Sequence, residues 1–189
     1  MSFDEAALIR SCQAGNLADF DPLYTHYMKP IYGFIYRRTL DRQTAEDITS
    51  ITFIKALEKI GSYRGDRGVF AAWLYSIARN AITDHFRTAH PHTDIEDAWD
   101  LSSDEDVAGK VRDRMSHAEL RKALQKLKPA QREIVILRLW DGLSYKEIAQ
   151  VTGKTEGNCK VIFSRTLDTL RAELPLLVFL ALLLAPRSL

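Results

Sequence analysis

The segment LSYKEIAQVTGKTEGNCKVIFSRTLDTLR, residues 143–171, decides the fold of the C-terminal part of the chain. Ser144 is placed to cap a short helix, and Gly153 permits the tight turn that follows it. Thr155 is placed to cap a second helix, which runs through Arg171. Two short helices joined by such a turn are typical of the helix-turn-helix unit, whose second helix enters the major groove of DNA.

The second helix of this segment has two different faces. Its apolar residues form one stripe, which is expected to face a core: Cys159, Ile162, Phe163, Leu167 and Leu170. The cap and the residues off that stripe are the candidate DNA contacts: Thr155, Glu156, Asn158, Lys160, Val161, Ser164 and Arg165. An ordinary helical hairpin with a solvated face is the alternative interpretation.

Charge along the chain is uneven although the formal net charge is only +1. Residues 1–90 contain 11 Lys and Arg against 10 Asp and Glu. Residues 91–116 contain 3 against 8, and residues 117–172 contain 11 against 6. The basic balance of the last part favours a polyanionic partner and, with Gly153 and the capped helix ends, supports DNA binding.

Residues 1–90 read as helices with almost no strand signal. Gly15 and Asn16 end a short first helix, and apolar residues at helical spacing predict a second over residues 18–40. Pro30 lies inside this second helix and is expected to bend or split it. Further helices are expected over residues 45–60, after a start signal at Asp41, and over residues 70–88.

The remaining segments differ sharply in composition. Seven acidic residues and no Lys or Arg lie between Asp94 and Asp106, which predicts a flexible acidic linker. Helices are expected to resume near Ser116, where Ser116 and Glu119 have capping-box spacing, and again at Pro129. We therefore expect an all-α chain with two small helical domains: residues 5–90, a linker at 91–115, residues 116–172, and an apolar tail at 173–189.

Nothing in the sequence indicates catalysis, a cofactor or a metal. The five histidines form no i, i+4 pair around a Glu, and no Gly-rich phosphate loop is present. Cys12 and Cys159 lack metal-ligand spacing and are read as reduced thiols. The first ten residues have no basic start followed by an apolar stretch, so we expect no secretory signal and a cytoplasmic protein.

Two stretches carry a family resemblance. AEDITSITFIKAL, residues 45–57, resembles the AED-x-T-x-x-TF-x-x-A pattern of region two of bacterial RNA polymerase sigma factors. FAAWLYSIARN, residues 70–80, is similar to the F-x-x-WL-x-x-IARN stretch of that region. LKP at residues 127–129, followed by Arg132 and Glu133, is similar to the start of region four. The order of the motifs and the short linker resemble the extracytoplasmic-function group of the sigma-70 family.

The resemblance implies a promoter-specificity subunit that binds core polymerase and DNA and is no enzyme. It implies docking on the clamp helices of the largest polymerase subunit through Glu46, Asp47, Ile51, Phe53, Ile54 and Leu57. It implies contact with an unstacked base of the −10 promoter element, and with its surroundings, through Tyr63, Arg64, Arg67, Arg79, Asn80, Asp84 and Arg87. The helix-turn-helix would read the −35 element, and further expected partners are the flap of the second-largest polymerase subunit and an anti-sigma factor.

The chain also departs from the family pattern. The loop at residues 67–69 is one residue longer than the pattern has. The family often reads E-G-T-V-K-S-R-L where this chain has EGNCKVIF, residues 156–163, so a basic residue near Ile162 is missing. A helix-turn-helix regulator with a sensor domain and a nucleic-acid-processing enzyme remain the alternative functions.

The apolar tail has three interpretations. Thirteen residues, 174–186, are too few to span a bilayer, which needs about 20. The tail can fold back onto an apolar groove of the protein, dock on an inhibitory partner, or attach shallowly to a membrane. Our hypothesis is that it packs against the protein and restrains the two domains, because a free apolar run is an aggregation liability.

Overall fold

The computed structural model describes residues 3–39, 41–89, 122–124, 126–176 and 179, and these contain helices and no strand. The prediction of an all-α chain with two helical domains is confirmed. The chain divides into two compact units, Met1–His92 and Thr93–Leu189. None of the described helices is long and apolar enough to cross a membrane. The predicted linker, and the predicted helix start at Ser116, lie outside the described residues.

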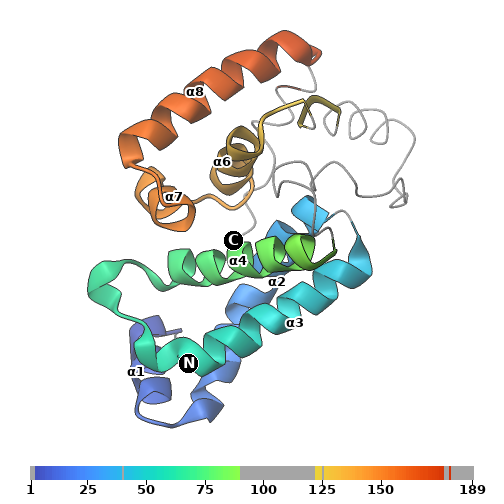
Figure 1. The fold of residues 1–189 in the computed structure, drawn as a ribbon. Helices are drawn as coiled ribbons and strands as arrows, with labels where there is room; N and C mark the ends of the chain where they lie inside the picture. The colour runs from blue at the N-terminus through green and yellow to red at the C-terminus, as the bar shows by residue number, and fades with distance from the viewer. Residues whose placement is uncertain (1–2, 40, 90–121, 125, 177–178, 180–189) are drawn as a thin grey trace. The chain divides into compact units, whose positions relative to one another are not determined.

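The first unit consists of four α-helices and three short 3₁₀ turns (Figure 1). In chain order they are α1 (Glu5–Gln13), η1 (Leu17–Asp19), α2 (Phe20–Thr39), α3 (Arg42–Lys59), η2 (Ile60–Ser62), η3 (Gly65–Arg67) and α4 (Phe70–Ala89). Helices α2, α3 and α4 pack on one another, and α1 packs on α2. Their shared core buries Phe34, Ile48, Leu74 and Ile82.

Pro30 does not split the second helix, as one form of the prediction had it. Helix α2 is not split, because it runs without a break from Phe20 to Thr39 with Pro30 inside it. Proline deprives one turn of a hydrogen bond, a local loss that tertiary packing can offset. Buried residues on both sides of Pro30, Leu23 before it and Ile31 and Phe34 after it, provide that packing.

Helix α3 begins directly after the predicted start signal at Asp41, three residues before the predicted first residue, Ala45. The carboxylate of Asp41 accepts a hydrogen bond of 2.7 Å from the backbone N–H of Thr44, which satisfies one free donor of the first turn. Bonds donated by Thr44 lower the pKa of Asp41. The cap therefore keeps its charge in more acidic solution than a free Asp would.

The second unit contains α6 (Pro129–Leu139), α7 (Tyr145–Thr152) and α8 (Glu156–Glu173). Both α6 and α7 pack against α8. The buried guanidinium of Arg132 donates to the carbonyl oxygens of Leu124 (2.8 Å) and Leu127 (3.3 Å), and so ties α6 to the segment before it. Helix α6, which was expected to begin at Pro129, is therefore held both by α8 and by the segment that precedes it.

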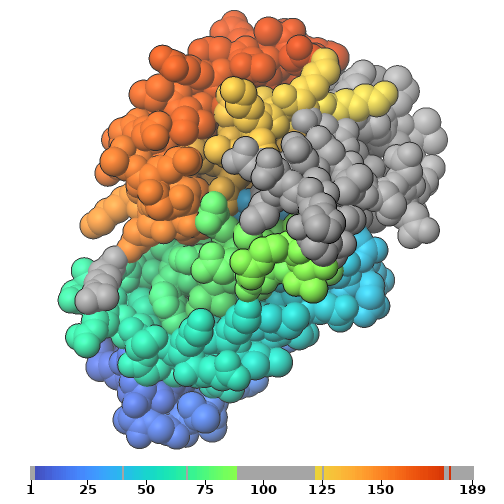
Figure 2. Space-filling view, in the orientation of Figure 1, coloured from blue at the N-terminus to red at the C-terminus, as the bar shows by residue number. Residues whose placement is uncertain are grey.

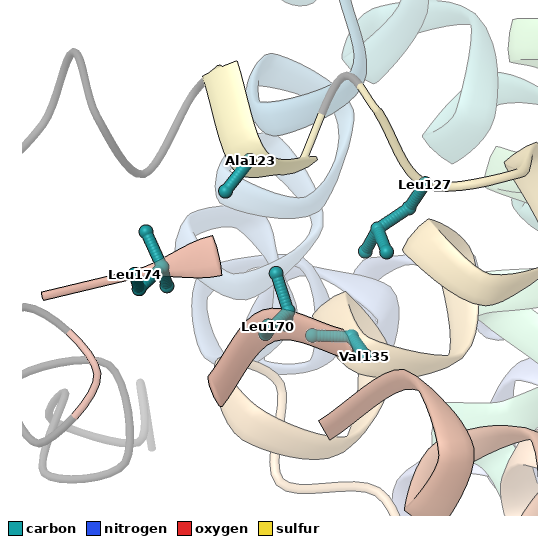
Figure 3. Packing of buried hydrophobic residues seen from close by; sticks show 5 residues of the cluster. All are labelled: Ala123, Leu127, Val135, Leu170 and Leu174. Carbon is teal, nitrogen blue, oxygen red and sulfur yellow. The ribbon is translucent and has the colours of Figure 1, made fainter. Parts of the chain in front are cut away.

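The start of the apolar tail belongs to the core of this unit. Leu174, which is 7% exposed, packs with Ala123, Leu127, Val135 and Leu170 (Figure 3). Phe179 packs against the same cluster. For these two residues the tail folds back onto the protein, the first of the three interpretations. The residues after Phe179 lie outside the described part of the chain.

Candidate nucleic-acid interface

The helix-turn-helix is held by three local devices. The hydroxyl of Ser144 accepts from the backbone N–H of Glu147 (3.3 Å), and the Glu147 carboxylate accepts from the backbone N–H of Ser144 (2.6 Å). This reciprocal capping box fixes the start of α7. Gly153 has a φ of 70°, in the left-handed region where glycine carries no steric penalty. Thr155 accepts from the backbone N–H of Asn158 (3.2 Å) and caps α8.

All seven residues predicted to contact DNA from this unit are exposed: Thr155, Glu156, Asn158, Lys160, Val161, Ser164 and Arg165. On the opposite side of α8, Cys159 and Leu170 are buried as predicted. Thr166 is buried as well, which the apolar pattern missed. Its hydroxyl donates to the carbonyl of Ile162 at 2.7 Å, so the polar group is satisfied inside the core.

Tyr145 is a residue of this interface that the sequence did not single out. The guanidinium of Arg138 lies 4.8 Å from the centre of its ring, and the ammonium of Lys160 lies 5.7 Å from it. Arg138 also donates to the carbonyl of Leu143 (2.8 Å), and the ring meets Phe163 edge-on. Because Arg138, Tyr145 and Lys160 come from three helices, no local spacing could have predicted their meeting.

In the first unit, the exposed face of α3 is the predicted polymerase-docking surface. Ile51 is 44% exposed and Ile54 is 57% exposed, which is unusual for isoleucine in a small helical domain. Leu57 is half-buried. Phe53 is only 5% exposed and meets Tyr24 of α2 edge-on, with ring centres 4.8 Å apart. Phe53 therefore supports this surface from below rather than forming it, and the half-exposed Tyr24 extends it.

The two predicted acidic contacts on α3 are exposed but already have partners. Glu46 pairs with Arg42 at 2.8 Å, and Asp47 accepts from the side-chain amide of Gln43 at 3.2 Å. Both bonds lie between residues four apart on the same helix, where they contribute only a few tenths of a kcal/mol. Such weak bonds can be exchanged for contacts to a protein partner at small cost.

The loop between η2 and α4 is braced by aromatic packing. The Tyr63 hydroxyl donates to the carbonyl of Gly68 (2.9 Å), and its ring packs against Phe70 and Trp73. Burial, followed by the nearby charge of Glu5, raises the pKa of Tyr63. Tyr63 thus holds the loop in shape instead of presenting a free hydroxyl to a base. Arg64 is exposed, whereas the side chain of Arg67 lies outside the described residues.

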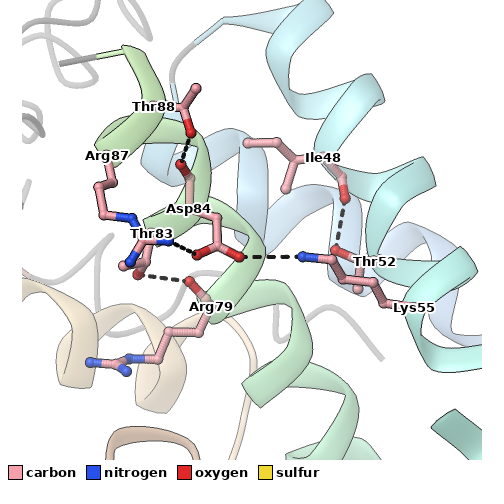
Figure 4. Close-up of polar contacts among 8 residues, drawn as sticks. All are labelled: Ile48, Thr52, Lys55, Arg79, Thr83, Asp84, Arg87 and Thr88. Atoms are coloured by element: carbon pink, nitrogen blue, oxygen red, sulfur yellow. Dashed lines mark hydrogen bonds and ion pairs between the residues drawn. The ribbon is translucent and has the colours of Figure 1, made fainter. Parts of the chain in front are cut away.

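Helix α4 carries the remaining predicted residues beside α3 (Figures 1 and 2). Asn80 is exposed and Arg79 is half-buried. Asp84 forms ion pairs with Lys55 of α3 (3.3 Å) and with Arg87 (3.2 Å), as Figure 4 shows. The Asp84 carboxylate therefore positions Arg87 and links the two helices, which suits it poorly for direct contact with anionic DNA.

Gln13 of α1 is a second residue that the sequence analysis missed. Its side-chain amide donates to the carbonyls of Ile60 (3.0 Å) and Tyr63 (2.9 Å), at the start of the loop. Each bond crosses more than forty residues of sequence. The amide thereby anchors the loop to the N-terminal helix.

Replacing Gln13 with Ala should loosen this loop. Losing two hydrogen bonds worth about 0.5–1.5 kcal/mol each, or about 1–3 kcal/mol together, should speed amide exchange of residues 61–69 by roughly fivefold to a hundredfold. Hydrogen-exchange mass spectrometry of the full chain measures this rate. Gln43→Ala, which removes a bond only within α3, is the matched control, and equal exchange in both variants would contradict the anchoring role.

The geometry defines a class: a helical protein with a helix-turn-helix in one unit and an exposed apolar face in the other. Comparisons with known proteins give the family. Residues 23–91 match the family Sigma-70 region 2, and residues 117–170 match Sigma-70, region 4.

Individual proteins agree. The chain is 38% identical to the ECF RNA polymerase sigma factor BldN of Streptomyces coelicolor, over 89% of this chain and 65% of that protein. It is 34% identical to the RNA polymerase sigma factor YlaC of Bacillus subtilis, over 70% and 79%. Among solved structures, the sigma factor RpoE of Bartonella quintana, in complex with the anti-sigma factor NepR, matches with a TM-score of 0.64 and 26% identity, over 89% of this chain and 99% of that one.

The chain therefore belongs to the extracytoplasmic-function group of the sigma-70 family of RNA polymerase sigma factors. It is a non-enzymatic transcription initiation factor, as the resemblance of its motifs implied. The alternatives, a helix-turn-helix regulator with a sensor domain and a nucleic-acid-processing enzyme, are not favoured.

Proposed function

We propose that this sigma factor divides promoter recognition between its two units, residues 5–90 and 116–172, and docks on polymerase through α3. Ile51, Ile54 and Leu57, with Glu46 and Asp47 at one end, contact the clamp helices of the largest polymerase subunit. Tyr24 adds to this surface. The single observation that carries the docking proposal is the exposure of Ile51 and Ile54 on a helix whose other side is fully packed.

The −10 element is contacted as a single strand by α4 and by the loop between η2 and α4. Asn80 offers an amide that can hydrogen-bond the edge of an unstacked base, and Arg64 and Arg87 offer charge to the backbone. Tyr63 and Asp84 position these groups. Helices α3 and α4 pack on each other and are joined by the Lys55–Asp84 ion pair, which supports the proposal that docking and base contact belong to the same unit.

The −35 element is contacted as duplex DNA by α8, through the exposed residues from Thr155 to Arg165. In a helix-turn-helix, the N-terminal residues of the second helix contact the bases. In this chain that end is the capped start of α8. The flap of the second-largest polymerase subunit is the expected partner of this unit. An anti-sigma factor is a further expected partner, since the solved Bartonella relative is bound by one. We expect the protein to act in the cytoplasm.

Reconstituted transcription tests this function. Purified core polymerase with the full chain should give run-off transcripts from promoters identified by genomic binding, whereas the chain without core should show no stable promoter affinity. The reason is that each unit contacts only part of a promoter, and core polymerase fixes the two at the proper distance. Ile54→Asp, which places a charge in the docking surface, should remove most transcript, while Ile51→Val is the conservative control. Transcription equal to that of core alone would contradict the proposal.

A further inference from the structure

The net positive charge of residues 117–172 is not concentrated on the DNA-reading helix, α8. Helix α8 carries three acidic and three basic residues: Glu156, Asp168, Glu173, Lys160, Arg165 and Arg171. Much of the excess comes instead from Lys122, Lys126 and Lys128, which precede α6. Lys126 pairs with Glu173 at the end of α8 opposite to its cap. The basic balance that suggested DNA binding thus belongs mostly to another part of the unit.

At the reading end of α8, the one lysine is already engaged. The Lys160 ammonium lies 2.7 Å from the Glu156 carboxylate, one turn earlier, and 5.7 Å from the centre of the Tyr145 ring. The hydrogen bond and the charge of Lys160 lower the pKa of Glu156, which is therefore ionised at neutral pH. Any DNA phosphate that approaches Lys160 therefore also meets the negative charge of Glu156, which competes with it for the ammonium.

We propose that Glu156 is a specificity-determining residue, which holds Lys160 as an exchangeable counter-ion and so lowers affinity for DNA of unrelated sequence. This inference rests on the proposed contact of α8 with the −35 element. Repulsion between Glu156 and phosphate acts on every sequence alike. A matching site can offset it, because a glutamate carboxylate accepts from the N4 amino group of cytosine in the major groove. Built-in repulsion of wrong partners is a general route to specificity.

The test compares promoter binding by the full chain assembled with core polymerase. Two duplexes are used, one with the intact upstream element and one with that element scrambled. Glu156→Gln keeps the size and the accepting oxygen of the side chain but removes the negative charge that holds Lys160. Discrimination between the duplexes should fall roughly threefold to tenfold, and the dependence of log affinity on log salt should steepen by about one unit for one added phosphate contact.

Two further variants separate the causes. Asp168→Asn makes the same charge change on the same helix, two turns beyond Lys160, and should leave discrimination within about twofold. In a Lys160→Ala background, Glu156→Gln should lose its effect on the salt dependence, because there is no lysine to release.

The outcomes distinguish this inference from the function on which it rests. If scrambling the element and Lys160→Ala both leave binding unchanged, the proposed −35 contact fails, and the inference with it. If scrambling weakens binding but Glu156→Gln keeps full discrimination, the counter-ion role alone is overturned. The same conclusion follows if Asp168→Asn reproduces the effect of Glu156→Gln, or if that effect persists without Lys160.

Discussion

Ending the chain after Glu173 should destabilise the second unit by about 2–5 kcal/mol, the range measured when large apolar side chains are removed from protein cores. The cut removes Leu174, which is buried among Leu127, Val135 and Leu170, and also Phe179. Small domains have only a few kcal/mol of total stability. We therefore expect much of this unit to be unfolded at 37 °C, while the first unit stays folded.

Matched chain ends and single substitutions test the cause. A chain ending after Phe179 keeps both packed residues and should remain close to the full chain in stability. Leu174→Ala in the full chain should reproduce much of the loss, whereas Leu176→Ala, at a side chain that is 68% exposed, should change stability by less than about 0.5 kcal/mol. Urea unfolding monitored by hydrogen exchange in α6 and α8 measures each value. Equal stability of the chains ending at 173 and at 179 would contradict the packing role.

The packing of Leu174 and Phe179 decides which truncation can test the tail hypothesis. The idea that residues 174–189 restrain the two domains stays a prediction, and a cut after Glu173 cannot test it, because that cut damages the second unit itself. The chain that ends after Phe179 can test it, because that chain keeps both packed residues. If residues 180–189 act as a restraint, this shorter chain should bind core polymerase more tightly than the full chain.

Asn80→Ala should impair promoter opening about tenfold or more while closed-complex binding changes by less than about twofold. A side chain that hydrogen-bonds a base edge contributes about 1–3 kcal/mol, and 1.4 kcal/mol corresponds to tenfold. Asn80 is exposed on α4, so its removal should not disturb the core. Permanganate footprinting measures opening, and filter binding on duplex DNA measures the closed complex.

The same substitution in the other unit provides the control. Asn158→Ala, on the exposed face of α8, should weaken closed-complex binding and leave the opening of the complexes that do form nearly unchanged. Asn80 and Asn158 thus should give opposite patterns in the two assays. If Asn80→Ala opened DNA normally, the assignment of the base contact to Asn80 would be wrong.

Local patterns predicted most of the helices in both units. Helix starts at Asp41, Pro129, Ser144 and Thr155 follow from side-chain caps and from proline geometry, which depend on three or four neighbouring residues. The apolar stripe of α8 likewise follows from helical periodicity. These features need no knowledge of what lies across the core, so one sequence is enough to find them.

The candidate sites were harder to predict because their contacts join distant segments. Phe53 and Ile54 are adjacent and both apolar, but Phe53 is buried against Phe20 and Tyr24 of α2 whereas Ile54 is exposed. The anchoring by Gln13 and the pairing of Asp84 with Lys55 depend on tertiary packing in the same way. Sequence spacing has no signal for such contacts.

Each unit contains one buried cysteine, which can serve as a kinetic probe of that unit alone. Cys12 lies in the first unit and Cys159 in the second, and both thiols are buried. Burial, together with the charge of Asp19, raises the pKa of Cys12 and makes it a poor nucleophile. Alkylation of either thiol therefore has to wait until the surrounding helices open, so its rate reports how often that unit opens. Because each unit contains one thiol, a single labelling time course followed by peptide mass analysis gives the opening rates of both units from one unmodified chain.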